Sequence, residues 1–339
     1  SLTNASTTSN NDTTSPKKTW ISLNFEDLQK IAIVTMFVSA MSGLLNLFVI
    51  VAIVMDPLKI LRKGPWVIIF NLATADLISS VSFFCFWGES FFTAISQKKL
   101  FFPIVNFSWA FGASSSFLWL TMFTVQVFVI TKAPLKGRYW FTTKMKVVSG
   151  IVIWLCAFLL GLTNMAWYFF PELPLVSLKL YIGQIAVLQI AVFVQIILNI
   201  QVAITITRAG GSVGNVENNK HQNIAKTVII LTLILFLTAF PYFLLKQMEL
   251  LERLGYFGQS EIAIFEGLAY CYTPIATLNF LANPILYSLR LPDYRKTLLV
   301  FVGRGSTRTY LKKSPMHISL TKQTKTSIAR SQKASTTLM

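Results

Sequence analysis

Seven long apolar stretches constrain this chain more than any other feature of its sequence. Each contains at least about 20 residues, which lets a helix cross about 30 Å of hydrocarbon. Because 54% of the 339 residues are hydrophobic and only 13% are charged, the chain cannot form a soluble globule with an ordinary polar surface. The sequence therefore predicts an all-α membrane protein, built as a seven-transmembrane helix bundle. The predicted spans run from Leu28 to Met55, Trp66 to Phe92, Ile104 to Thr131, Val147 to Phe170, Leu178 to Ile206, Ile224 to Leu251 and Ile262 to Leu289.

The positions of the basic residues predict the orientation of the spans. With the amino end outside, 22 of the 30 Lys and Arg residues fall in the inner loops and the carboxyl-terminal tail. Lys and Arg favour the cytoplasmic side, so we expect a multi-pass protein of the plasma membrane with a cytoplasmic carboxyl end. The net charge of +17 then reflects topology and contact with membrane lipid, and nucleic acid is not expected as a partner.

The two ends of the chain differ in composition from the spans. Residues 1–27 are predicted to form a disordered extracellular tail, glycosylated at Asn4 and Asn11, which both lie in N-x-S/T triplets. No signal peptide is visible, and a removed leader stays open because the chain begins without Met. Residues 303–339 are predicted to form a disordered, basic, Ser/Thr-rich cytoplasmic tail. Its phosphorylation would recruit an arrestin-like partner, and Thr337 to Met339 fit a PDZ ligand.

A short amphipathic eighth helix is predicted to complete a membrane domain of residues 28–302. Pro292 suits the first turn of a helix, and Tyr294 and Leu298 fall on the opposite side from Arg295 and Lys296. A helix of this pattern lies along the inner face of the membrane.

The seventh span contains polar residues that an apolar helix would not carry by chance, in the stretch from Asn279 to Tyr287. Pro284 removes one backbone hydrogen bond and clashes with the preceding turn, so the helix is expected to deform there. We expect Asn279, Asn283 or a water molecule to satisfy the backbone group that the proline leaves free. The alternative interpretation is an ordinary proline-kinked span whose polar residues face neighbouring helices.

Asp76 is the one acidic residue deep inside a predicted span. It lies ten residues past the edge at Trp66, which places it about 15 Å into the membrane. A carboxylate among short oxygen-bearing side chains can hold a hard cation such as Na⁺ or a proton, or it can join helices in a purely structural network. Both readings stay open. The polar residues expected at similar depth are Asn46, Ser116, Asn279 and Asn283.

Two of these stretches resemble motifs of the rhodopsin-like (class A) G-protein-coupled receptors. Asn71-Leu-Ala-Thr-Ala-Asp76 is similar to their second-helix signature, and Asn283-Pro-Ile-Leu-Tyr287 is similar to their seventh-helix NPxxY motif. The resemblance implies a heterotrimeric G protein as partner and Na⁺ as an allosteric ion, with no other cofactor. It assigns Asp76, Asn46, Ser116, Asn279 and Asn283 to the sodium site, and Pro284, Tyr287 and Pro241 to the activation switch.

The chain also departs from the pattern of that family. The third-helix Asp/Glu-Arg-Tyr triplet falls on Gln126, Val127 and Phe128, so the arginine that contacts the G protein is missing. Ala239 stands where the family has a buried Trp two residues before the sixth-helix proline. None of the three cysteines is placed for the usual outer disulfide. The resemblance therefore supports the switch better than it supports coupling to a G protein.

A ligand pocket is expected among aromatic and acidic residues in the outer thirds of the spans. Short outer loops favour a small molecule or a short peptide as ligand, and the two acids favour one that bears an amine. Aromatic residues at helix ends are also typical of the interfacial belt, which is the alternative for each of them. The candidates are Trp87, Glu89, Trp109, Tyr168, Tyr242, Glu266 and Tyr270.

These features together predict a cell-surface receptor and not an enzyme. The two histidines, His221 and His317, stand apart in a loop and a tail, and no phosphate-binding loop is present. One alternative is a non-signalling partner that sequesters or traffics another receptor, which the missing arginine favours. An ion transporter or channel is a further alternative because of Asp76, but the matched, interrupted helices of transporters are not found.

Overall fold

The computed structural model describes residues 25–61, 65–89, 100–133, 141–209, 216–256 and 262–301. Within these ranges the chain forms eight helices and no strand. Residues 1–24, with Asn4 and Asn11, and residues 303–339 lie outside the described residues, whereas residues 25–27 of the predicted amino-terminal tail form the first turn of α1. The helices are α1 (Phe25–Met55), α2 (Trp66–Trp87), α4 (Phe101–Lys132), α6 (Thr143–Phe169), α7 (Pro174–Ala209), α8 (Val216–Arg253), α9 (Ile262–Arg290) and α10 (Pro292–Phe301).

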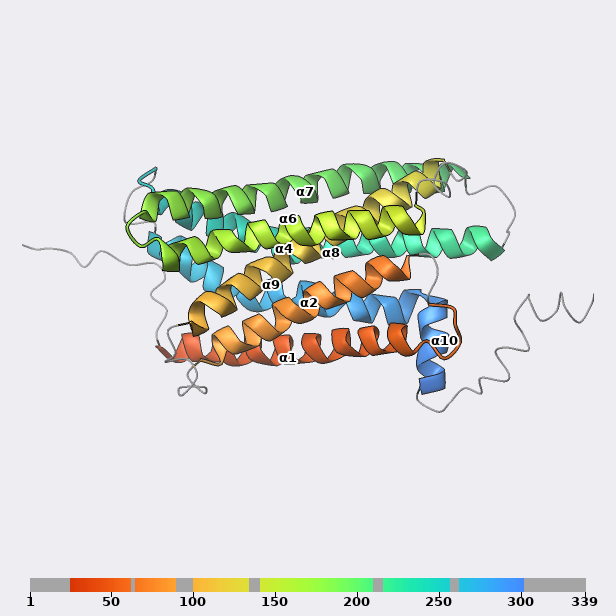
Figure 1. The fold of residues 1–339 in the computed structure, drawn as a ribbon, viewed down its shortest axis with the longest axis horizontal. Coiled ribbons are helices and arrows are strands. Elements are labelled where there is room, and N and C mark those ends of the chain that lie inside the picture. Colours follow the sequence, from red (N-terminus) through yellow and green to blue (C-terminus); the bar gives the residue numbers. More distant parts are fainter. Residues whose placement is uncertain are drawn as a thin grey trace, which may run out of the picture.

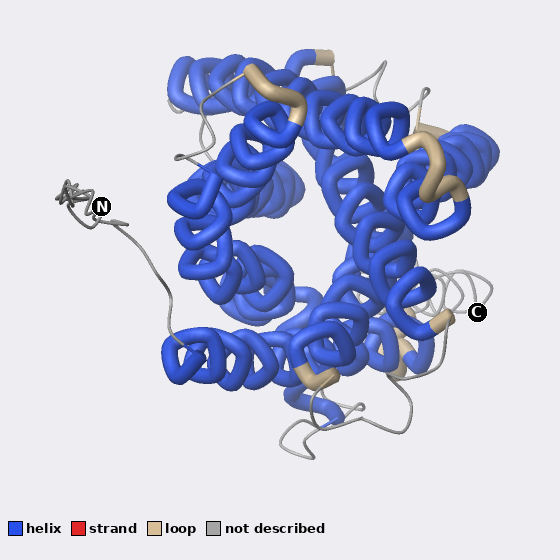
Figure 2. Tube along the Cα trace, turned by 90° about the vertical axis from the view of Figure 1, so that its left-hand side faces the viewer, coloured by secondary structure: helices blue, strands red, loops and turns tan. Residues whose placement is uncertain are grey.

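Seven of the helices form a bundle, and the eighth lies across one end of it (Figure 1). Viewed end on, the long helices surround a common centre (Figure 2). α4 contacts α2, α6, α7 and α8, whereas α9 packs against both α1 and α8 and so closes the ring. The predicted seven-transmembrane bundle with a short eighth helix is confirmed.

Six helices in the described part of the chain are long and apolar enough to cross a membrane. The exception in the bundle is α9, which carries Pro274, Pro284, Asn279 and Asn283 along its length. These residues lower its mean hydropathy, but α9 is packed between α1 and α8, so its polar groups face protein. Length and composition alone therefore do not identify α9 as a membrane span.

The bundle turns its apolar side chains outward and keeps many of its polar ones inside. Leu155 and Leu159 on α6 are 58% and 64% exposed, as expected for a lipid-facing surface, while Asn46 and Asp76 are fully buried. Polar contacts also join the helices laterally: Trp154 Nε1 on α6 donates a 2.9 Å hydrogen bond to Asn71 Oδ1 on α2.

Most helices begin before the predicted spans: α1 at Phe25 instead of Leu28, α6 at Thr143 instead of Val147, α7 at Pro174 instead of Leu178 and α8 at Val216 instead of Ile224. The second and third spans also differ from the predicted ones. α2 ends at Trp87, and the N–H of Gly88 closes its last turn on the Phe84 carbonyl at 3.0 Å. Phe92, the predicted end, lies outside the described residues. α4 begins at Phe101 instead of Ile104, because Pro103 is tolerated in the first turn of a helix.

α10 begins at Pro292, where the sequence places it, and uses its apolar side to dock on the bundle. Tyr294 is 2% exposed and stacks on Trp66 of α2, with 6.2 Å between ring centroids. Burial raises the pKa of the Tyr294 hydroxyl. Arg295 and Lys296 are exposed on the other side, so α10 is amphipathic as predicted.

Gly112 sets the distance between α2 and α4 near the middle of the bundle. A Cβ atom added there would lie 2.6 Å from Ser79 Oγ, 2.8 Å from the Ser79 backbone nitrogen and 3.0 Å from the Ala75 carbonyl oxygen. The absence of a side chain at this position lets the two backbones come close together. It therefore helps to bring Ser116, one turn further along α4, within reach of Asp76.

We predict that Gly112→Ala destabilises the protein, because the added methyl group pushes against the backbone of α2. The expected loss is about 1–3 kcal/mol, seen as a lower Tm of the detergent-solubilised chain. Gly183→Ala on α7 is the matched control, since its Cβ would meet nothing within 4 Å, and it should be neutral or slightly stabilising. Equal Tm values for the two variants would contradict the close approach.

Candidate functional site

The carboxylate of Asp76 is the centre of a buried polar network. The side chain is 0% exposed; Ser116 Oγ on α4 donates a 2.6 Å hydrogen bond to Oδ1, and Asn283 Nδ2 on α9 donates a 2.5 Å bond to Oδ2. The network therefore joins three helices that are distant in sequence. No salt bridge pairs Asp76 with a basic side chain among the described residues. Since a carboxylate buried without a cation is costly, this group is suited to hold a cation or a proton.

Asn46 on α1 binds the backbone of α9. Its Nδ2 donates 3.0 Å hydrogen bonds to the carbonyl oxygens of Phe280 and Ser42. Phe280 precedes Pro284 by four residues, so its carbonyl lacks the N–H that a regular helix supplies. The donor is therefore Asn46, and not Asn279 or Asn283 as expected from the sequence, because the group that reaches this carbonyl comes from another helix.

The remaining members of the predicted sodium site are buried nearby. The Asn46 Oδ1 atom is buried without a hydrogen-bond partner, and Asn279 is 2% exposed. No hydrogen bond from Asn279 to Asp76 is found in the described ranges, so its part in the site stays a prediction.

Ser42 and Ser80 belong to the same network, although sequence reasoning missed them. The Ser80 hydroxyl lies 2.8 Å from Ser42 Oγ and 2.7 Å from the backbone carbonyl oxygen of Asp76. Each serine lies four residues from a predicted member of the site, Ser42 from Asn46 and Ser80 from Asp76. That spacing places each pair on one helix face, and it is the signal that could have identified them.

Tyr287 lies one helical turn beyond Asn283 on α9. Its side chain is 0% exposed, and its hydroxyl is buried without a hydrogen-bond partner. Leaving a buried hydroxyl unpaired costs about 1–3 kcal/mol. A conformation in which Pro284 lets this part of α9 move would regain that energy if the hydroxyl found a partner there.

Pro241 interrupts α8 in the same way that Pro284 interrupts α9. The carbonyl four residues before it belongs to Leu237, and the Tyr272 hydroxyl of α9 donates a 2.6 Å hydrogen bond to that oxygen. Ala239, in place of the family's Trp, is 3% exposed in the core. Tyr272 was not among the predicted residues, because nothing in the sequence shows which helix faces the freed carbonyl.

The Gln126, Val127 and Phe128 triplet lies at the end of the bundle that carries α10. Val127 is 6% exposed within the apolar core, and Gln126 is 4% exposed with an unpaired Oε1 atom. Both line a small cavity of about 70 Å³, together with Pro65 and Ile224. This part of α4 therefore presents a largely apolar surface, with Gln126 and Thr131 as its polar side chains.

A larger cavity of about 210 Å³ lies toward the opposite end of the bundle and is lined by residues of α2, α4, α6, α7, α8 and α9. We call it the outer cavity, after the orientation predicted for the spans. Its wall contains four of the predicted pocket residues, Trp87, Trp109, Tyr242 and Tyr270. An adjoining cavity of about 170 Å³ is lined by Tyr168, and the two share Asn106, Asn164 and Tyr181.

Neither predicted acidic pocket residue lines these cavities. Glu89 is exposed in the turn after α2. Glu266 lies beside the Tyr270 hydroxyl, at 3.5 Å, and within 3.8 Å of the Arg253 guanidinium. The acidic rim expected from the sequence is therefore not part of the cavity wall.

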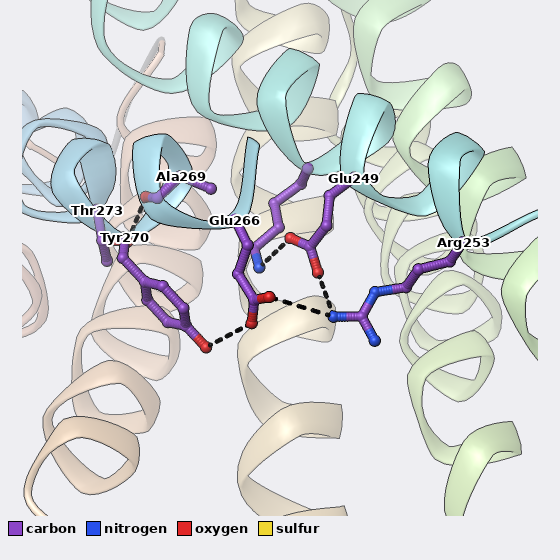
Figure 3. A network of polar contacts seen from close by, with 7 residues as sticks. Glu249, Arg253, Glu266, Ala269, Tyr270 and Thr273 are labelled. Atoms are coloured by element: carbon purple, nitrogen blue, oxygen red, sulfur yellow. Dashed lines mark hydrogen bonds and ion pairs between the residues drawn. The ribbon is translucent and has the colours of Figure 1, made fainter. Parts of the chain in front are cut away.

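A charged network that the sequence did not reveal lies next to the cavity (Figure 3). Glu249 accepts from Lys246 at 2.7 Å and from Arg253 at 2.9 Å, and its side chain is only 6% exposed. These three residues stand three and four positions apart on α8, so they share one helix face. That spacing is a signal in the sequence, but the basic residues there were interpreted as topological charge.

Comparison with known proteins agrees with this arrangement. The family described as "7 transmembrane receptor (rhodopsin family)" matches residues 45–287, which include the outer cavity, Pro241, Pro284 and all of the Asp76 network except Ser42. No curated protein matches the chain.

We predict that Tyr272→Phe loosens α8 around Pro241, because the Leu237 carbonyl loses its donor. The expected cost is about 1 kcal/mol of unfolding free energy, with faster amide hydrogen exchange in the α8 segment around the proline. Tyr256→Phe is the matched control, since Tyr256 is 72% exposed and should change neither quantity. Unchanged exchange in Tyr272→Phe would show that this hydrogen bond does not hold the kink.

Proposed function

Because the chain belongs to the rhodopsin family of seven-transmembrane receptors, we propose that it carries the binding of a small molecule or short peptide to a cytoplasmic transducer. Proteins of this family are signalling receptors rather than enzymes, and they act with a ligand and a G protein. In physical terms, ligand binding shifts the chain between conformations that a transducer distinguishes.

The observation that carries this proposal is that the outer cavity and the two prolines share the same helices. On α8, Tyr242 and Lys246 line the cavity directly after Pro241. On α9, Tyr270 and Thr273 line it before Pro284. A ligand in the cavity therefore contacts the two elements whose backbone hydrogen bonding is interrupted, and these are the elements that can bend.

The Asp76 network supports the proposed sodium ion. The site offers hard oxygen atoms, which Na⁺ prefers: the buried Asp76 carboxylate, Ser116 Oγ and the unpaired Asn46 Oδ1. These residues would hold the ion, which would supply the positive charge that the buried carboxylate lacks. The chain itself holds α2, α4 and α9 together through the two hydrogen bonds to Asp76.

Burial of Val127 favours a second candidate, a receptor-like partner that sequesters another receptor. Val127 stands where the family has a transducer-binding arginine, and it is 6% exposed in the core. A G protein would meet an apolar surface there, not a cation. Measuring transducer recruitment and surface delivery together separates this candidate from a signalling receptor.

Several parts of the proposal concern segments outside the described residues. They comprise an extracellular, glycosylated amino-terminal tail of residues 1–24 and a cytoplasmic tail of residues 303–339 that binds an arrestin-like or a PDZ protein. Plasma-membrane localisation and the orientation of the chain rest on its basic loops.

We predict that NaCl raises the Tm of the purified full-length chain above that in choline chloride at equal ionic strength. Na⁺ at about ten times its Kd would add about 1.4 kcal/mol of stability. Asp76→Asn should abolish the difference, because the carboxamide brings no charge. The control is Asp293→Asn on α10, which should keep the Tm difference between NaCl and choline chloride. Equal responses of wild type and Asp76→Asn would exclude Asp76 as the sodium ligand.

We further predict that expression of the full-length chain in cells raises G-protein activation or arrestin recruitment, and that Tyr287→Phe reduces it without lowering the Tm. The hydroxyl has no partner in this conformation, so its removal costs little stability. Loss of signal together with loss of Tm would indicate simple misfolding. Normal surface delivery with no response in any transducer assay would favour the sequestering candidate.

A further inference from the structure

The outer cavity has a largely aromatic wall. Among the described residues that line it, Lys246 is the one charged side chain, whereas Glu249 and Arg253 line the adjoining cavity of about 170 Å³. The Lys246 ammonium lies 5.3 Å from the centroid of the Tyr270 ring and 2.7 Å from Glu249 Oε2. The aromatic members of the wall are Phe83, Phe86, Trp87, Trp109, Tyr181, Tyr242 and Tyr270.

The acidic residues near the cavity are already engaged by cations. Glu249 binds both Lys246 and Arg253, so one carboxylate is shared by two basic groups. Glu266 lies 3.8 Å from Arg253 and lines neither lobe of the cavity. An amine-bearing ligand, the kind expected from the sequence, would meet Lys246, and the Glu249 carboxylate in the wall of the adjoining cavity is already shared by Lys246 and Arg253.

The unpaired polar groups in the wall are hydrogen-bond donors. Trp87 Nε1 and Trp109 Nε1 are both buried without an acceptor. An indole N–H can only donate, and an ammonium also brings donors alone. Both N–H groups have almost no accessible surface in this conformation, so a ligand acceptor could satisfy one of them only if its ring turned toward the cavity, and an ammonium could satisfy neither.

We propose that this cavity takes an aromatic carboxylate, with Lys246 as its ionic partner. The carboxylate would replace Glu249 beside Lys246, while Arg253 keeps Glu249 neutralised at 2.9 Å. Every buried charge then retains a partner of opposite sign, which is the condition for placing an ion pair in a desolvated site. The body of the ligand stacks among the aromatic rings of the wall. This inference rests on the proposed receptor function, because it names the ligand class of the same site.

The test uses three probes with one phenylpropyl body and different charges: 3-phenylpropanoate, 3-phenylpropanamide and 3-phenylpropylamine. Each is titrated into the purified full-length chain in lipid nanodiscs, and Tm is measured against probe concentration. We expect the carboxylate to raise Tm by about 2 °C or more and to bind at least ~10-fold more tightly than the amide, with the amine weakest.

Substitutions at Lys246 assign the effect to this residue. Lys246→Met should make the carboxylate and the amide equivalent, whereas Lys246→Arg should keep the preference and so show that the fold is intact. Lys30→Met is the matched control, because Lys30 is also paired along its helix, with Glu26 at 2.8 Å, but is 65% exposed. It should behave as wild type.

Three outcomes would overturn the proposal. They are a carboxylate preference that persists in Lys246→Met, an amine that stabilises as well as the carboxylate, and no shift with any probe. The assay contains no transducer, so these outcomes would leave the proposed receptor function standing. Conversely, absence of transducer recruitment in cells would not alter a carboxylate preference measured on the purified chain.

Discussion

Backbone hydrogen bonding in a medium without water is the constraint on which the rest of this structure depends. A helix in hydrocarbon must satisfy its own N–H and C=O groups, and each internal proline leaves one carbonyl without its donor. Here the freed Phe280 carbonyl receives Asn46 from α1, and the freed Leu237 carbonyl receives Tyr272 from α9. The deformations at Pro284 and Pro241 are therefore held by side chains of neighbouring helices. Such bonds can be exchanged without unfolding the helix, which the proposed receptor function requires.

Buried charged side chains, like buried backbone groups, need partners in this bundle. Asp76 lies in the middle of the bundle with two hydrogen-bond donors and without a basic partner in the described residues, whereas Glu249 lies near one end between two cations. The first arrangement is suited to a cation from solution. The second leaves Lys246 with a partner that can be exchanged. The two sites are connected by α9, which contributes Tyr270 to the cavity and Asn283 to the Asp76 network.

The fold was predictable from the sequence to a large extent. The number of spans follows from the length of the apolar stretches, and the eighth helix and its buried side follow from the helical spacing of apolar residues. Both are local properties of the sequence. Boundaries were less certain: α2 ends at Trp87, short of the predicted Phe92, and α4 starts early because Pro103 fits a first turn. The motif residues Asp76, Ser116 and Asn283 were named together from depth alone, and the structure brings these three into direct contact.

What the sequence determined by itself is the class of the chain, its seven spans and the depth of its polar residues, because these depend on composition along one helix. The tertiary structure alone decided which side chains meet. In the folded bundle Asn46 donates to the Phe280 carbonyl, and Tyr272 donates to the Leu237 carbonyl. Lys246 lines the outer cavity, whereas Glu89 and Glu266 do not. The physical reason is rotational: a helix can turn about its axis at little cost in hydropathy, and packing against its neighbours fixes the face that each residue presents.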